Sequence, residues 1–252
     1  AYLEHLCGAW RSKMQSELAD QRPIVAVPAS FDAAARDLTV ESARNAGLPE
    51  PVLLEEPQAA LYAWIGATGG AWRKQIEVGD VILVVDVGGG TTDLSLIAVS
   101  EDQGELALTR VAVGEHILLG GDNMDLALAH QARTKLAQSG TKIDGWQFLE
   151  LGHGCRGAKE RLLSDEEVDE IPVAIQGRGS RLIGGTIRTG VTRAEAEHIL
   201  LEGFFPSVDI EARPKETRAL GIAEWGLSYA ADTSITAHLA AFLSRHAGAL
   251  SD

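Results

Sequence analysis

The sequence predicts a mixed α/β fold, and three observations support that class. Apolar segments of strand length alternate with segments of helical period over residues 1–66, and three strand-like segments follow between residues 81 and 113. Helix-like segments then dominate beyond Gly120. The 252 residues suffice for one large domain or two smaller ones.

The N-terminal region predicts a helix followed by two strand–helix pairs. Over residues 1–20, apolar side chains recur at steps of three and four, which predicts one apolar helix face: Leu3, Leu6, Cys7, Trp10 and Met14. "PIVAVPAS", residues 23–30, predicts a short buried strand, and a helix follows from about Asp32 to Ala46. "VLLEEPQAALYAWIGATGG" then predicts a short strand, an acidic turn and another helix.

Three strands are predicted next, at Val81–Asp86, Asp93–Val99 and Glu105–Val113. The first is apolar at five consecutive positions, which predicts a central strand covered on both faces, whereas the next two alternate more. Together the three segments predict an antiparallel meander.

The sequence beyond residue 118 predicts a second subdomain. Helical segments surround an acidic stretch at 164–171 and a β-like stretch, "IPVAI", at 171–175. Thr192 followed by Glu195 is the pattern of a capping box, which predicts the start of a helix within "VTRAEAEHILLEGF". Residues 206–252 are rich in Ala and Leu and predict helix, without a recognisable motif.

The composition bears on partners and compartment. The chain has 22 Lys and Arg residues against 36 Asp and Glu residues, and its net charge of −14 repels a phosphate backbone, so no nucleic-acid partner is expected. Apolar runs are far shorter than the roughly 18 residues of a membrane span, so no membrane segment is expected. Cys7 and Cys155 lack metal or disulfide spacing, which indicates buried thiols and a reducing compartment such as the cytoplasm.

The segment "VVDVGGGTTDLSLI", residues 84–97, places three glycines between two predicted strands. Consecutive glycines allow positive φ and leave backbone N–H groups uncovered, which suits an anion such as phosphate. Asp86 and Asp93 would repel a bare phosphate, so their presence indicates a hard cation such as Mg²⁺ and hence a nucleotide. The alternative is a tight hairpin turn that the two aspartates merely cap.

Other motifs carry less. "GHGCRG", residues 152–157, matches G-x-G-x-x-G, but no strand is predicted immediately before it, so a Rossmann site is not expected. The seven histidines show no metal spacing, and no Ser or Cys lies in a nucleophile elbow. Core packing is expected for the five tryptophans, Trp10, Trp64, Trp72, Trp146 and Trp225.

Several segments, in this order, resemble the nucleotide-binding domain of the seventy-kilodalton heat-shock (DnaK-like) chaperone family. "VPASFDAAARDLTVESARNAGL" is similar to a strand-loop-helix of that family, and "EEPQAAL" is similar to its connector. "DVGGGTTDLS" resembles its second phosphate-binding loop, and "LLGGDNMD" resembles the Gly-Gly-acidic turn after its third strand. "GCRGAKERLLS" and "VTRAEAEHIL" resemble later helices of its second lobe, so the resemblance covers about residues 1–204.

This resemblance implies an actin-like ATPase fold with a ribonuclease-H-like core, in which two lobes close on ATP or ADP with Mg²⁺. The matching positions imply a set of phosphate-binding residues, namely Gly88, Gly89, Gly90 and Thr91. Asp86 and Asp93 would help to hold magnesium through its waters. Glu56, the second acid of "EEP", would orient the attacking water, a role that suits phosphoryl transfer. Its plain alternative is an exposed acid that is favourable at a helix N-terminus.

Gly120 and Gly121 match a turn near the phosphates, as turn residues or as direct ligands, and Asp122 is expected as a helix N-cap. Lys159 matches a nucleotide-binding lysine of the family. Two positions beside Lys159 depart from the family by reversed charge, Arg156 and Glu160, and these residues could instead pair with each other at i, i+4.

The departures from the family suggest an incomplete site. Its first phosphate loop, the lysine that reaches the phosphates, its late adenosine-binding glycine loop and its peptide-binding β-domain have no counterpart here, and the chain opens without Met or a signal peptide. We therefore expect an internal fragment with half an ATP site, inactive by itself. The expected parts are a first-lobe part with connector at 1–79, the meander with the phosphate loop at 80–117, a second-lobe helical and β subdomain at 118–204, and a divergent helical tail at 205–252.

The function implied by the resemblance is that of a stress-response chaperone. Such a protein binds and hydrolyses ATP to control its hold on client polypeptides, with the help of co-chaperones. Two alternatives stay open. One is a non-catalytic scaffold of the same fold, which the reversed charges would permit; the other is a sugar kinase of the same fold, against which the connector "EEPQAAL" argues.

Overall fold

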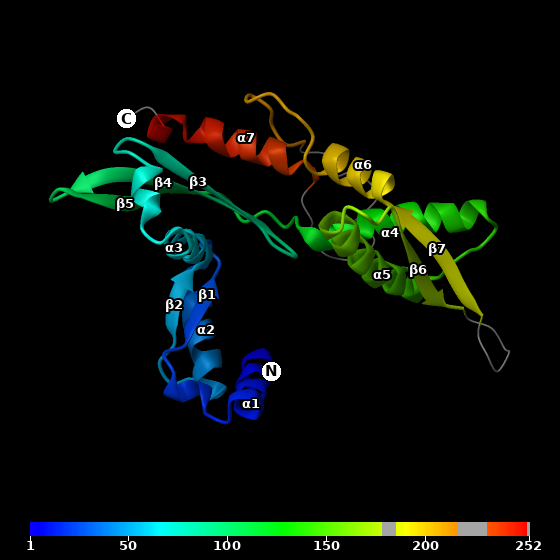
Figure 1. The fold of residues 1–252 in the computed structure, drawn as a ribbon, viewed down its shortest axis with the longest axis horizontal. Coiled ribbons are helices and arrows are strands. Elements are labelled where there is room, and N and C mark those ends of the chain that lie inside the picture. Colours follow the sequence, from blue (N-terminus) through cyan, green and yellow to red (C-terminus); the bar gives the residue numbers. More distant parts are fainter. Residues whose placement is uncertain (178–184, 216–230, 251–252) are drawn as a thin grey trace. The chain divides into compact units, whose positions relative to one another are not determined.

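A computed structural model describes residues 1–177, 185–215 and 231–250 (Figure 1). The chain forms two compact units, and each is described by itself. Unit 1 comprises Ala1–Asp86, Asp93–His116 and His246–Asp252, and unit 2 comprises Val87–Thr92 and Ile117–Arg245. Both units combine helices and strands, so the predicted α/β class is confirmed.

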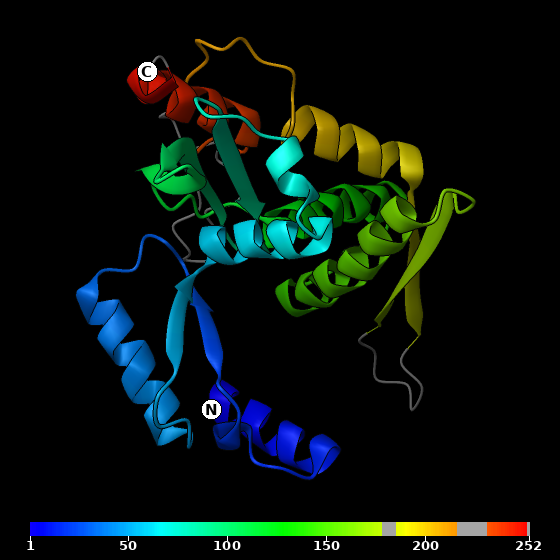
Figure 2. The ribbon, with the colours of Figure 1, turned by 60° about the vertical axis from the view of Figure 1, so that its left-hand side comes forward.

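The N-terminal part of unit 1 is a helix followed by a β-α-β motif and a further helix (Figures 1 and 2). Its elements are α1 (Tyr2–Met14), β1 (Ile24–Val27), α2 (Ala33–Asn45), β2 (Val52–Glu55) and α3 (Glu56–Thr68), with 3-10 turns at Leu18–Asp20 and Ala71–Lys74. Strands β1 and β2 pair in parallel, and the Asp32 side chain caps α2 by accepting a hydrogen bond from the Ala35 N–H at 2.8 Å. The predicted helices and strands are confirmed, although only Val27 of β1 is buried, and β2 leads directly into α3 without the predicted acidic turn.

Strands β3 (Val81–Val87), β4 (Thr92–Asp102) and β5 (Glu105–Val113) form a sheet in that order, with β4 and β5 antiparallel. The three predicted strands are confirmed, but the prediction that the first of them is central is wrong. The middle strand is β4, where Leu94 is 2% exposed, whereas Val85 of β3 is 42% exposed. The reason is that a strand's burial depends on how many neighbours it acquires, which an apolar run does not encode.

The helical part of unit 2 packs two helices against a β-hairpin (Figures 1 and 2). Its elements are α4 (Gly121–Gln138), α5 (Gly145–Ser164), β6 (Glu170–Gln176), β7 (Thr186–Thr192) and α6 (Arg193–Gly203). The core combines side chains of both layers, including Leu128, Leu151, Cys155, Val173 and Val191. The sequence did not predict β7, because "TIRTGVT" is polar and is stabilised as a strand by antiparallel pairing with β6.

The C-terminal region contains α7 (Ile235–Arg245) and a 3-10 turn at Ala247–Leu250. Residues 205–215, which the sequence predicts as part of a helical tail, contain neither helix nor strand. Helix α7 agrees with the predicted helix, whereas residues 216–230, which include Trp225, lie outside the described residues. The expectation of core packing is wrong for Trp146, which is 68% exposed at the start of α5.

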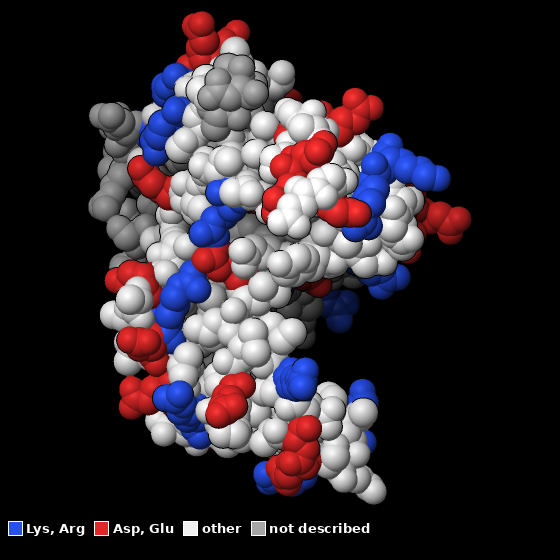
Figure 3. All heavy atoms as spheres, turned by 90° about the vertical axis from the view of Figure 1, so that its left-hand side faces the viewer, with Lys and Arg blue, Asp and Glu red and all other residues white. Residues whose placement is uncertain are grey.

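Other features of the described residues bear on the sequence predictions. None of their helices is long and apolar enough to cross a membrane. On the face drawn in Figure 3, basic and acidic side chains are interspersed.

Cys7 and Cys155 are buried free thiols, and burial, together with the charge of Asp125, raises the pKa of Cys155 to about 12. Residues 152–157 lie inside α5 without a preceding strand, which confirms that the glycine pattern there is not a Rossmann loop.

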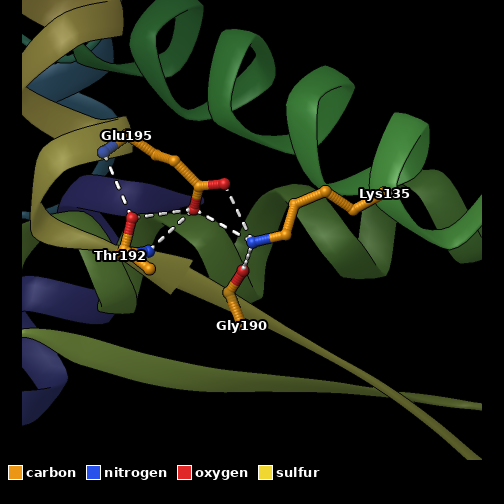
Figure 4. Close-up of polar contacts among 4 residues, drawn as sticks. All are labelled: Lys135, Gly190, Thr192 and Glu195. Atoms are coloured by element: carbon orange, nitrogen blue, oxygen red, sulfur yellow. Dashed lines mark hydrogen bonds and ion pairs between the residues drawn. The ribbon is translucent and has the colours of Figure 1, made fainter.

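A polar network in unit 2 ties α4 to the start of α6 (Figure 4). The Lys135 ammonium donates to Glu195 Oε1 at 2.9 Å and to the Gly190 carbonyl at 2.8 Å. The Glu195 carboxylate accepts from the Thr192 N–H, and the Thr192 hydroxyl accepts from the Glu195 N–H, so the predicted capping box is confirmed. Burial alone would raise the pKa of Glu195, but hydrogen bonds from Thr192 and Lys135 outweigh it and lower that pKa.

Replacing Lys135 by methionine is expected to lower the free energy of unfolding by roughly 1–3 kcal/mol at neutral pH, because a half-buried carboxylate loses its cation. The folded-state pKa of Glu195 is lowered. The ionised carboxylate of Glu195 therefore contributes fully to the free energy of unfolding above its unfolded-state pKa, and this contribution is lost as the pH falls through the folded-state pKa. Urea denaturation should therefore show a smaller deficit in acid than at neutral pH. Lys142→Met, at an exposed position, is the control; an equal deficit at both pH values would contradict this account.

Candidate functional site

The glycine segment forms a tight turn in unit 2, between the end of β3 and the start of β4. The Gly88 N–H donates to the Thr91 carbonyl at 2.8 Å, which closes the turn. Within the described part of the chain, the N–H groups of Gly89, Gly90 and Thr91 have no acceptor. None of the three glycines has positive φ, so the conformational reason given for them from the sequence is wrong. Their missing side chains instead leave the N–H groups uncovered and allow close packing.

That close packing is against the N-terminus of α4. The N–H groups of Gly121 and Asp122 donate to the carbonyls of Gly88 and Gly89 at 2.9 and 2.7 Å. A Cβ atom at Gly120 would lie 2.6 Å from the Gly88 carbonyl oxygen, so only glycine fits there. Two backbone hydrogen bonds therefore join the turn and the N-terminus of α4 into one assembly.

The residue that caps α4 is not the one predicted. Gly120 occupies the N-cap position, and its N–H donates to the Asn123 side chain at 2.9 Å. Asp122 lies in the first turn instead, where its charge still favours the positive end of the helix. The prediction of Asp122 as the N-cap is wrong because the Gly120 backbone must approach the glycine turn, a constraint that is not local in sequence.

Lys159 of α5 points toward this assembly. Its ammonium lies 2.6 Å from Asp125 Oδ1 and donates to the Gly121 carbonyl at 3.2 Å, and its side chain is only 12% exposed. Burial raises the pKa of Asp125, while the bond from Lys159 opposes that rise. In this structure Lys159 fixes α5 to the first turn of α4, next to the glycines that the sequence groups with it.

The two charge-reversed residues pair with each other. Arg156 Nε lies 3.2 Å from Glu160 Oε1, which confirms the i, i+4 pair, and Arg156 also lies 3.8 Å from Asp122. All three side chains are more than half exposed, so the network stabilises the fold little. Its effect is on the charge pattern beside the helix N-terminus.

The predicted acidic residues lie in unit 1, where three carboxylates interact. Glu56 is the first residue of α3, Asp86 is near the end of β3, and Asp93 is in β4 and 6% exposed. Burial raises the pKa of Glu56, the charges of Asp86 and Asp93 raise it further, and His116 lowers it. Glu56 is half-buried in the first turn of α3, and its carboxylate lies in a field of like charge that a cation would offset.

His116 was not predicted from the sequence. Its Nδ1 lies 2.9 Å from Asp93 Oδ1, so the ring orients that carboxylate. In the sequence, the only hint was that His116 lies shortly before the Gly-Gly turn at 120–121. A single histidine does not form a spacing pattern, so the sequence could not show that it contacts a residue of another strand. Among the described residues no cluster of three or more Asp, Glu, His or Cys side chains could hold a metal ion by itself.

A mixed α/β protein with an open glycine turn bonded to a helix N-terminus, and carboxylates where its chain enters and leaves that turn, is typical of phosphate- and nucleotide-binding proteins. The family model described as "Hsp70 protein" matches residues 6–205. The chain belongs to the Hsp70 family.

Curated relatives agree with this membership. The chain is 32% identical over 160 residues to the "Chaperone protein HscA homolog" of Acinetobacter baylyi, covering 62% of this chain and 24% of that protein. It is 38% identical over 154 residues to the "Chaperone protein HscA" of Photorhabdus laumondii (60% and 22%), and 36% identical over 172 residues to that of Yersinia enterocolitica (68% and 25%). The chain spans about a quarter of the length of these relatives.

Proposed function

We propose that the whole protein is an ATP-hydrolysing chaperone with the actin-like ATPase fold, and that this chain supplies part of its ATPase domain. The observation that carries the proposal is the glycine turn at Gly88–Thr91, which presents uncovered N–H groups and is braced by the N-terminus of α4. Membership of the Hsp70 family and the names of the chaperone relatives support the assignment to ATP and to client polypeptides.

Different residues of the chain would bind the phosphates, hold the magnesium ion and orient the attacking water. The N–H groups of Gly89, Gly90 and Thr91 would donate to phosphate oxygens, since they have no acceptor among the described residues. Asp86 and Asp93 would orient the waters of Mg²⁺, which when bound neutralises phosphate charge. Glu56 would orient the attacking water, and the negative charges of Asp86 and Asp93, which act on its carboxyl group, favour a cation in their neighbourhood. Lys159 and the glycine pair at 120–121 would hold the phosphate-binding turn in shape.

The direct test is ATP turnover by the whole protein. We expect slow hydrolysis that chelation of magnesium abolishes and that a co-chaperone or client accelerates. A protein that binds neither ATP nor ADP would overturn the proposal and leave the non-catalytic scaffold. Phosphorylation of a sugar would instead bring the kinase of the same fold forward.

The chain by itself allows a second, separate test. Because its sequence lacks counterparts of the family's other phosphate and adenosine loops, we expect calorimetric titration with ATP and magnesium to show no binding tighter than about 100 μM. Binding near micromolar would contradict the half-site prediction and would show that the glycine turn and Lys159 suffice. The matched control is the same titration with magnesium alone.

One observation favours the scaffold as a second candidate. Arg156 is bound to Glu160 and near Asp122, so the charges beside the helix N-terminus are satisfied internally rather than directed to a ligand. Restoring the family's signs with Arg156→Glu and Glu160→Arg should strengthen ADP affinity of the whole protein if lost base recognition is the cause. Co-chaperones, a stress response and a cytoplasmic location stay predictions, the last supported by two buried, unpaired thiols.

A further inference from the structure

Glu55, the residue before Glu56, forms an ion-pair cluster within unit 1. Its side chain is 12% exposed, and its two carboxylate oxygens have different partners. Arg36 Nη2 of α2 lies 2.5 Å from Oε1, and Arg110 Nη1 of β5 pairs with Oε2. The cluster therefore joins α2 and β2, which follow each other in the sequence, to the distant strand β5.

The cluster contributes more to the orientation of Glu55 than to the free energy of unfolding. A carboxylate this buried loses most of its hydration, and charged pairs of this kind often contribute little net stability compared with apolar residues of the same size. Their geometric effect is stronger, because two guanidinium groups that bind opposite oxygens hold a carboxylate in one orientation. Glu55 is thus an anchor for the backbone at the end of β2.

Glu55 directly precedes Glu56, so fixing Glu55 also fixes the backbone from which the Glu56 side chain projects. Glu55 is the N-cap residue of α3, and buried Pro57 follows Glu56 in its first turn, so the backbone is fixed on both sides of Glu56. The Glu56 carboxylate interacts with Asp86 and Asp93, both of like charge.

We propose that the ion pair between Glu55 and Arg110 fixes the start of α3, and with it Glu56, relative to the sheet that carries Asp93. Arg110 lies on the strand that pairs with β4, and β4 carries Asp93, so the pair connects the start of α3 to the sheet that carries the second carboxylate. Glu55 and Arg110 are accordingly positioning residues. Their importance for turnover rests on the proposed function, in which Glu56 acts in ATP hydrolysis.

The test is spectroscopic and needs no nucleotide. With ¹³C-labelled Glu side chains in the 252-residue chain, Asp93→Asn should shift the carboxyl resonance of Glu56 at neutral pH. In an Arg110→Met background the same substitution should shift it at least about threefold less, because Glu56 is no longer fixed relative to the sheet that carries Asp93. Arg110→Lys, which keeps the cation, should restore part of the response. The control is Arg11→Met, which removes the arginine of an exposed Arg–Glu pair in the same unit.

Two further results keep the proposal open to refutation. Glu55→Gln must reproduce the loss, which guards against a specific folding defect of Arg110→Met, and thermal melting must show that each variant stays folded. An unchanged response in both variants would overturn the positioning role. In the whole protein, Arg110→Met should lower kcat with little change in KM, and it should add no loss to Glu56→Ala. A whole protein without turnover, but with the spectroscopic coupling intact, would refute the proposed function and leave the positioning role standing.

Discussion

Replacing Glu56 by alanine is expected to lower ATP turnover by the whole protein about a hundredfold or more, while ATP affinity changes little. The carboxylate is half-buried and in the field of two other acids, Asp86 and Asp93, a place suited to orienting water near a cation rather than to binding phosphate. Single-turnover hydrolysis and equilibrium nucleotide binding, measured on the same preparation, separate the two effects. Glu50→Ala, an exposed acid in the same unit, is the matched control. Unchanged turnover would remove Glu56 from the mechanism.

The ionised carboxylate of Glu56 is also expected to lower the stability of the folded chain at neutral pH. The folded-state pKa of Glu56 is raised, so the folded chain binds this proton more tightly than the unfolded chain does. Stability from this group is consequently lost as the pH rises from the unfolded-state pKa through the folded-state value. Glu56→Gln, which removes the charge and keeps the shape, is expected to raise the melting temperature at neutral pH and to have less effect in acid. A lower melting temperature at neutral pH would contradict the like-charge account.

Replacing Gly120 by alanine is expected to destabilise the chain by about 2–4 kcal/mol. The new Cβ atom would meet the carbonyl oxygens of Gly88 and Gly89 at 2.6 and 2.7 Å, and these are backbone atoms that cannot rotate away. The hydrogen bonds that the N–H groups of Gly121 and Asp122 donate to the turn would lengthen or break. In the whole protein, nucleotide affinity should fall with stability, because the turn loses its brace.

Gly157→Ala supplies the control for this experiment. Gly157 is exposed in the interior of α5, with open space around an added Cβ, so alanine there should stabilise the chain by roughly 0.5–1 kcal/mol through helix propensity. Urea denaturation of both variants measures the difference. Equal effects of the two substitutions would show that the contact between the turn and α4 does not constrain Gly120.

Local patterns predicted much of the fold. The two strand–helix pairs near the N-terminus follow from apolar runs and helical segments, and the capping box at Thr192 follows from two residues three apart. The predictions that failed concerned features that depend on contacts between distant parts of the chain. Strand β7 depends on its pairing with β6, and the central place of β4 depends on strand order, so neither is written in a single segment.

By itself, the sequence determined the elements of the candidate site: a glycine turn, two aspartates beside it, a Gly-Gly helix start, and Glu56 at the head of a helix. Only the tertiary structure decided that the glycines serve close packing rather than positive φ, and that Gly120, not Asp122, caps α4. It also decided that His116 bonds Asp93 and that Arg110 pairs with Glu55. The physical reason is that these contacts join residues from different elements, whose approach is set by packing rather than by spacing along the chain.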